Sequence, residues 1–195
     1  MSKNFLPVNK QDMEERGWRE LDVIIVTGDA YVDHPSYGAG VIGRVLENAG
    51  FRVGIIAQPD CQRPEDFQRM GRPKLFFGVT AGNLDSMVAN YTANKNHRRN
   101  DEYSPCAKPN LRPNRASIVY TNRIKELFPN IPVVLGGMEA SLRRLGHYDY
   151  WSDKVRRSIL LDAKADILVY GMGEKQVLEI AARLKQGHSG QTLDN

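Results

Sequence analysis

The feature that most constrains this chain is a series of five short apolar runs separated by segments with helical patterns. The first run contains Val23-Ile24-Ile25-Val26, and the predicted strands span residues 21–27, 52–57, 75–80, 133–135 and 166–170. Continuous runs of this kind are typical of strands covered on both faces, as in parallel sheets. The intervening patterns predict helices over residues 37–49, 64–69, 84–92, 116–128, 151–161 and 174–185. The alternation predicts an α/β fold, with a doubly wound, mostly parallel, five-stranded sheet and helices on both faces.

The length of the chain, 195 residues, suits one domain of this type. Residues 1–20 have little periodicity and are predicted to form an N-terminal arm. The domain itself is expected over residues 21–188. Within it, residues 94–115 contain three prolines and no regular pattern, which is typical of a long functional or disordered excursion.

Composition sets the broad class of the protein. The chain is 41% hydrophobic and 26% charged, as expected of a soluble globular protein. It contains no apolar run near the roughly 20 residues of a membrane span and no signal peptide. Cys61 and Cys106 stand alone, without the spacing of a disulfide framework or a metal site. We therefore predict a reducing cytoplasmic location, and no catalytic or metal-ligating residue on this chain.

The net charge of +4 has a local origin. Between residues 94 and 115 there are six basic and two acidic residues, so this segment carries 6 − 2 = +4 and the rest is balanced. A solvated loop is one interpretation of this segment. Binding to nucleic-acid phosphates is the other.

Candidate site residues follow three of the predicted strands. In open α/β sheets, ligands bind at the loops that leave the carboxyl ends of the strands. Glycine turns there let the backbone approach a ligand, and helix starts can receive an anion, although the acidic residues equally suit helix capping. The predicted cofactor-binding residues are Gly28, Asp29, Asp33, His34 and Ser36 after the first strand, Gly136, Gly137 and Glu139 after the fourth, and Gly171, Gly173 and Glu174 after the fifth.

Two other motifs have more than one interpretation. The segment from Gly38 to Gly43 is a literal G-x-G-x-x-G, but it begins eleven residues after Thr27. A dinucleotide fingerprint needs its first glycine at the end of the strand, so close helix packing is favoured over NAD or FAD binding. Residues 142–151 mix arginines with aromatic residues, which suits a domain interface and also base stacking. The interface is the favoured interpretation.

Four strings of residues carry a family resemblance: VTGDAYVDHPS at 26–36, GIIAQP at 54–59, GGMEASLRR at 136–144 and HYDYWSDKVRRSIL at 147–160. They resemble the N-terminal region of the YgiQ-like radical SAM proteins, in the same order and over nearly the whole chain. The resemblance implies a Rossmann-like domain similar to the cobalamin-binding domains that precede many radical SAM barrels. The cobalamin motif D-x-H-x-x-G is absent, and Asp33-His34 is a near miss, so cobalamin binding on this domain stays open.

In this family a barrel follows the domain, and its C-x-x-x-C-x-x-C motif holds a [4Fe–4S] cluster that reduces S-adenosylmethionine. This chain lacks that motif. The resemblance therefore implies the accessory domain of a radical SAM enzyme, inactive alone, with residues 189–195 beginning a linker to the barrel. The barrel would be its partner in cis or in trans. Two alternatives remain open: a standalone nucleic-acid or nucleotide-binding α/β module, and a small Rossmann oxidoreductase.

Overall fold

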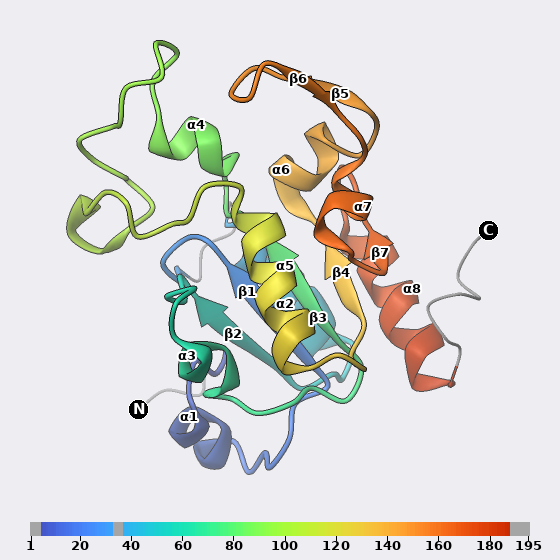
Figure 1. Cartoon of the computed structure of the whole chain (residues 1–195). Coiled ribbons are helices and arrows are strands. Elements are labelled where there is room, and N and C mark those ends of the chain that lie inside the picture. Colours follow the sequence, from blue (N-terminus) through green and yellow to red (C-terminus); the bar gives the residue numbers. More distant parts are fainter. Residues whose placement is uncertain (1–4, 33–36, 188–195) are drawn as a thin grey trace.

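A computed structural model describes residues 5–32 and 37–187 of the chain (Figure 1). Of the predicted site residues, Asp33, His34 and Ser36 lie outside the described residues, as does the predicted linker at 189–195. None of the helices in the described ranges combines the length and the apolar character that crossing a bilayer requires.

The centre of the domain is a five-stranded parallel sheet with the strand order β2-β1-β3-β4-β7. Its register aligns Ile25 with Ile55 on one side and with Gly78 on the other. This arrangement confirms the predicted doubly wound α/β class. The strands are β1 (Val23–Thr27), β2 (Val53–Ala57), β3 (Phe76–Thr80), β4 (Val133–Leu135) and β7 (Ile167–Leu168).

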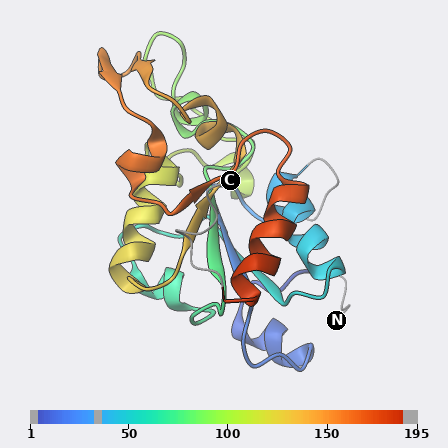
Figure 2. The same ribbon diagram turned by 90° about the vertical axis from the view of Figure 1, so that its right-hand side faces the viewer.

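Helices cover both faces of the sheet, as Figures 1 and 2 show. Alternate side chains of β1 enter two separate cores: Ile24 and Val26 face one, while Val23 and Ile25 face the other. The first core is closed by α3 (Pro64–Gln68), α5 (Ala116–Leu127) and α7 (Ile159–Ala163). The second is closed by α2 (Gly38–Asn48) and α8 (Glu174–Lys185), which contact each other.

Shorter elements surround this frame. Asn9 caps α1 (Lys10–Glu15) in the N-terminal segment, whose Met13 enters the core. Trp18 packs against the same core, and the Arg16 guanidinium lies 5.0 Å from the Trp18 ring. The remaining elements are α4 (Ser86–Asn90), the 3-10 helix η1 (Pro105–Ala107), α6 (Gly137–Leu142), β5 (His147–Asp149) and β6 (Lys154–Arg156).

The helix predicted over residues 151–161 is wrong. The turn and the second strand of the antiparallel hairpin β5–β6 occupy the first part of this region, and α7 begins only at Ile159. Trp151, Val155 and Ile159 have helical spacing, but they do not form one buried face, because Val155 is 82% exposed. The Trp151 ring instead packs against Tyr91 at 5.0 Å, a contact to a segment 60 positions earlier that a helical spacing cannot anticipate.

Candidate functional site at the carboxyl edge of the sheet

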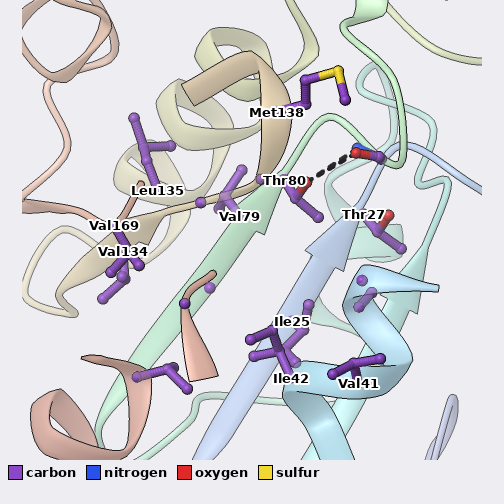
Figure 3. A pocket seen from close by; sticks show the side chains of 18 of the residues that line it. Ile25, Thr27, Val41, Ile42, Val79, Thr80, Val134, Leu135, Met138 and Val169 are labelled. Carbon is purple, nitrogen blue, oxygen red and sulfur yellow. Dashed lines mark hydrogen bonds between the residues drawn. The ribbon is translucent and has the colours of Figure 1, made fainter. Parts of the chain in front are cut away.

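A cavity opens at the point in the sheet where the strand order reverses, between β1 and β3. The chain passes from β1 through α2 to β2, and then returns to β3 on the opposite side of β1. The loops after β1 and β3 therefore diverge and leave a crevice at the carboxyl edge, which is where ligands bind in open α/β sheets. The cavity there measures about 440 Å³, within the usual range of ligand pockets (Figure 3).

The interior of the cavity is apolar and its mouth is polar. Ile25 and Val134 line it from the sheet, and Ile42 and Val177 line it from α2 and α8. Figure 3 shows Ile25 close to Ile42, and Val134 close to Val169. Such a site would hold an apolar group inside and orient a polar group at the rim. The polar lining residues are Thr27, Asp29, Tyr37, Thr80, Asn83 and Glu174.

The structure brings six of the predicted site residues together at this cavity, although their part in binding stays a prediction. They come from the ends of three strands, as the sequence rule required. These residues are Asp29, Gly136, Gly137, Gly171, Gly173 and Glu174. Two others, Gly28 and Glu139, do not line the cavity. Gly28 serves close packing, since a Cβ there would lie 2.2 Å from the carbonyl oxygen of Ala81.

Asp29 lies at the rim, but its carboxylate is held inside the protein. Its Oδ1 lies 2.7 Å from Nη2 of Arg112, and both side chains are fully buried. Its Oδ2 accepts a hydrogen bond of 2.6 Å from the backbone N–H of Asn83. Burial raises the pKa of Asp29 to about 6, although the Arg112 charge and the Asn83 hydrogen bond oppose that rise. Asp29 therefore links the ends of β1 and β3 to residue 112.

The excursion at residues 94–115 is fastened to the domain by Arg112. Nη2 of Arg112 lies 3.1 Å from Oδ2 of Asp101, and its Nε donates to the carbonyl of Gly28 at 3.1 Å. The Ala30 N–H donates to the carbonyl of Tyr103 at 2.8 Å, which adds a backbone contact beside β1. The basic excursion thus forms a cover at the carboxyl edge.

This fastening changes the interpretation of the local positive charge. Arg112 is buried between two carboxylates, Arg115 pairs with Asp149, and Lys95 donates to the carbonyl of Tyr150. The Arg98 guanidinium donates to two backbone carbonyls. Within the described part of the chain, this leaves Arg99 and Lys108 as the segment's cations without such a contact. The charge excess therefore has a structural role, which weakens the argument for a nucleic-acid surface.

Asp149 holds the β5–β6 hairpin against the excursion. Its carboxylate accepts hydrogen bonds from Ser152 and Arg115. Burial alone would raise the pKa of Asp149, but these hydrogen bonds and the Arg115 charge outweigh it and lower the pKa to about 2. Tyr150 adds a hydrogen bond of 3.0 Å to the carbonyl of Ala93. The favoured interface at residues 142–151 is thus in part an interface within this domain.

Glu139 has a structural position away from the cavity. It is 1% exposed and lies in the first turn of α6. Its Oε2 accepts from the Ser86 N–H at 2.8 Å, and its Oε1 accepts from the Ser117 N–H at 3.1 Å. One carboxylate thereby satisfies N–H groups at the starts of both α4 and α5, which otherwise have no intrahelical partner.

Tyr37 and Asn83 are cavity residues that the sequence analysis missed. The buried Tyr37 hydroxyl donates to the carbonyl of Ala30 at 2.6 Å, and burial raises its pKa above the usual range. Asn83 Oδ1 accepts from the N–H of Gly38 at 3.4 Å, at the start of α2. Asn83 follows the third strand, so the rule applied to the other strand ends would have found it. Tyr37 lies ten residues after the end of β1, so its position relative to a strand end did not indicate a site residue.

Exposed apolar side chains of α6 and of the segment between β7 and α8 lie at the mouth of the cavity. Met138 is 48% and Met172 is 81% exposed, and both line it. Leu142 and Tyr170 extend this apolar surface, and the Arg144 guanidinium lies 5.2 Å from the Tyr170 ring. A hydrogen bond of 3.1 Å from Gly171 N–H to Ser141 Oγ joins α6 to the β7–α8 loop. We call the exposed side chains of Met138, Leu142, Tyr170 and Met172 the rim patch.

The two cysteines do not form a cluster site. Cys61 follows β2 and packs against the core, whereas Cys106 is exposed within η1. Among residues 5–32 and 37–187, no three His, Cys, Asp or Glu side chains gather as metal ligands would. The thiols present here do not fit the three-thiolate ligation of a [4Fe–4S] cluster.

Comparison with known proteins places this chain in a family. The family model described as "Radical SAM N-terminal" matches residues 5–195. UPF0313 proteins of Thermotoga neapolitana, Methanosarcina acetivorans and Pseudomonas aeruginosa are 65%, 63% and 61% identical over 93%, 95% and 94% of this chain. The matched region is 32%, 25% and 24% of those proteins, so the chain spans a third or less of their length. No solved structure matches the chain. The chain therefore belongs to the Radical SAM N-terminal family.

Proposed function

We propose that this chain is the N-terminal domain of a radical SAM enzyme and that it presents its carboxyl-edge cavity to the part of the protein that follows. The observation that carries the proposal is the rim patch, because two of its members, Met138 and Met172, lie at the mouth of the cavity. Met172 is 81% exposed and Leu142 is 64% exposed. Contiguous exposed apolar side chains mark interaction surfaces. In relatives that are about three to four times as long, the additional sequence would supply a partner in cis to cover this patch.

The cluster and S-adenosylmethionine belong to the rest of the protein in this proposal. A [4Fe–4S] cluster would there supply the electron that cleaves S-adenosylmethionine to methionine and a 5′-deoxyadenosyl radical. The residues of this chain would exclude water and shape the space beside that reaction. Apolar walls such as Ile25 and Val134 suit that task, because a site closed to water protects reactive intermediates.

Hydrogen–deuterium exchange tests the docking. We expect backbone amides at residues 138–142 and 170–172 to exchange more slowly in the longer protein than in the 195-residue chain. Amides of α1, at the opposite edge of the sheet, serve as the internal control and should exchange equally in both (Figure 1). Substituting Met172→Asp should remove the extra protection and leave the melting temperature of the short chain unchanged, because this side chain is exposed. Equal exchange at both segments would rule out docking through the rim patch.

Cobalamin is the cofactor that we propose for this domain. The open carboxyl edge and the Gly136-Gly137 turn at the mouth of the cavity support the proposal, since glycine lets a large planar ligand approach the backbone. Titration of the 195-residue chain with hydroxocobalamin, followed by its visible absorption spectrum, should show a saturable change. A spectrum that stays that of free hydroxocobalamin at all protein concentrations would exclude this cofactor.

A further inference from the structure

Gly78 occupies an unusual place at the centre of the sheet. It lies in the middle of β3, the central strand of the five, where a glycine weakens the strand and leaves no side chain to pack. Its backbone φ is not positive, so any residue could adopt its conformation. A Cβ built there would meet Ile25 Cγ1 at 3.7 Å and Phe76 Cε2 at 3.8 Å, which are ordinary van der Waals contacts. The protein backbone and packing do not require this glycine.

Other glycines of the same sheet and its helices differ from Gly78. A Cβ on Gly54, the second residue of β2, would lie 2.4 Å from Met70 Cε and 2.6 Å from Leu21 Cδ1. A Cβ on Gly43, in α2, would lie 2.4 Å from Leu6 Cδ1. Close packing therefore accounts for these two glycines. It does not account for Gly78, where a larger residue would fit and would strengthen the strand.

The missing side chain leaves a notch in the floor of the cavity. The sheet register places Ile25 of β1 on one side of Gly78 and Val134 of β4 on the other. Phe76 and Thr80 lie before and after it on the same face, because alternate residues of a strand share a face. All five residues line the cavity. Gly78 is only half-buried despite its central position, so the notch is open to the cavity.

The surroundings of the notch define the shape and polarity of its occupant. The floor is a sheet, and the opposite wall consists of apolar side chains of α2 and α8, among them Ile42 and Val177. A flat, apolar group fits between a sheet and a layer of apolar side chains. Asn83 and Glu174 lie among the polar residues of the lining. Within the described residues, the half-buried Glu174 carboxylate has no hydrogen bond or ion pair, so it favours an uncharged or cationic donor over an anion.

We propose that the cavity binds a flat aromatic or heteroaromatic ring system, seated over Gly78 between Ile25 and Val134, with its hydrogen-bonding groups at the Asn83–Glu174 side. The proposal rests on the proposed function in taking this cavity as the ligand site of the domain. It adds the class of ligand and the residue that makes room for it. Glycine at position 78 is then kept for binding at the expense of strand stability.

The test uses the 195-residue chain with benzimidazole as the probe, titrated by calorimetry. Cyclohexanol, a non-planar ring, and decanoate, an acyl chain with an anionic end, serve as ligand controls. Substitution Gly78→Val should fill the notch and weaken benzimidazole binding by about tenfold or more. It should leave the melting temperature unchanged or raised, because valine favours strands and its Cβ would make only ordinary van der Waals contacts. Gly146→Val, in an exposed loop outside the cavity, is the matched control and should bind as the wild type does.

Several outcomes would overturn the proposal. Wild-type affinity in a folded Gly78→Val protein would show that the notch is not the seat of the ring. No binding of benzimidazole to the wild type, or tighter binding of decanoate or cyclohexanol, would reject the ligand class. If Gly78→Val does not fold, Gly78→Ala replaces it, with the same expected direction. These results are independent of the exchange experiment: docking can fail while benzimidazole binds, and the reverse holds too.

Discussion

Replacing Arg112 with methionine is expected to lower the free energy of unfolding by about 3–5 kcal/mol, one of the two largest effects that we predict for a single substitution. The reason is that Arg112 is fully buried with the carboxylates of Asp29 and Asp101, at 2.7 and 3.1 Å. Methionine keeps the approximate length of the side chain but leaves two buried acids without a counter-charge. Urea denaturation followed by circular dichroism measures the loss. Arg99→Met, an exposed position in the same basic segment, is the matched control and should cost less than about 0.5 kcal/mol.

The pH dependence of this effect has a definite sign. In the wild type the pKa of Asp29 is about 6, above its ordinary value of 3.8. Between pH 3.8 and about 6, the folded state therefore holds a proton that the unfolded state has lost. The free energy of unfolding falls as the pH rises through this range. Removing Arg112 should raise the pKa further, so the difference between variant and wild type should grow above pH 6. A pH-independent difference, or a fully stable variant, would contradict the buried charge network.

Replacing Glu139 with alanine is the second large prediction. The substitution removes the acceptor for the Ser86 N–H and the Ser117 N–H, at 2.8 and 3.1 Å, and leaves both donors buried at helix starts. Each unsatisfied buried donor costs about 1–3 kcal/mol, so the expected loss of unfolding free energy for the two donors is about 2–6 kcal/mol. Thermal and urea unfolding measure it directly. Protection of the first-turn amides of α4 and α5 against exchange should decrease at the same time.

Glu174→Ala is the matched control for Glu139→Ala. Both glutamates follow a glycine turn at the end of a strand, and both lie in the first turn of a helix. Glu174 is half-buried and lines the cavity. Its loss should cost less than about 0.5 kcal/mol. Equal destabilisation by the two substitutions would show that Glu139 does not cap two helices as described.

The β5–β6 hairpin shows where local sequence patterns fail to predict secondary structure. Trp151, Val155 and Ile159 have helical spacing, but Trp151 packs against Tyr91 and Val155 is exposed. The helix α6 was missed for a similar reason, since Gly136-Gly137 reads as a turn. In the structure Gly137 adopts a φ of +80° at the start of that helix, where a Cβ would lie 2.3 Å from Thr80 Oγ1. In both cases long-range contacts outweigh local propensity.

The sequence by itself determined the sheet and the edge that carries the cavity. Apolar runs of β-branched residues can be recognised one strand at a time, and the carboxyl ends of parallel strands must meet at one edge. Only the tertiary structure decided what each polar or glycine residue does there. Asp29 and Glu174 look alike in sequence, yet Asp29 is locked to Arg112, 83 positions later, while Glu174 stays open to the cavity. Gly54 and Gly78 look alike too, and differ because Met70 fills the space above one and a notch lies above the other. Such roles depend on burial and on partners distant in the chain, which no local pattern encodes.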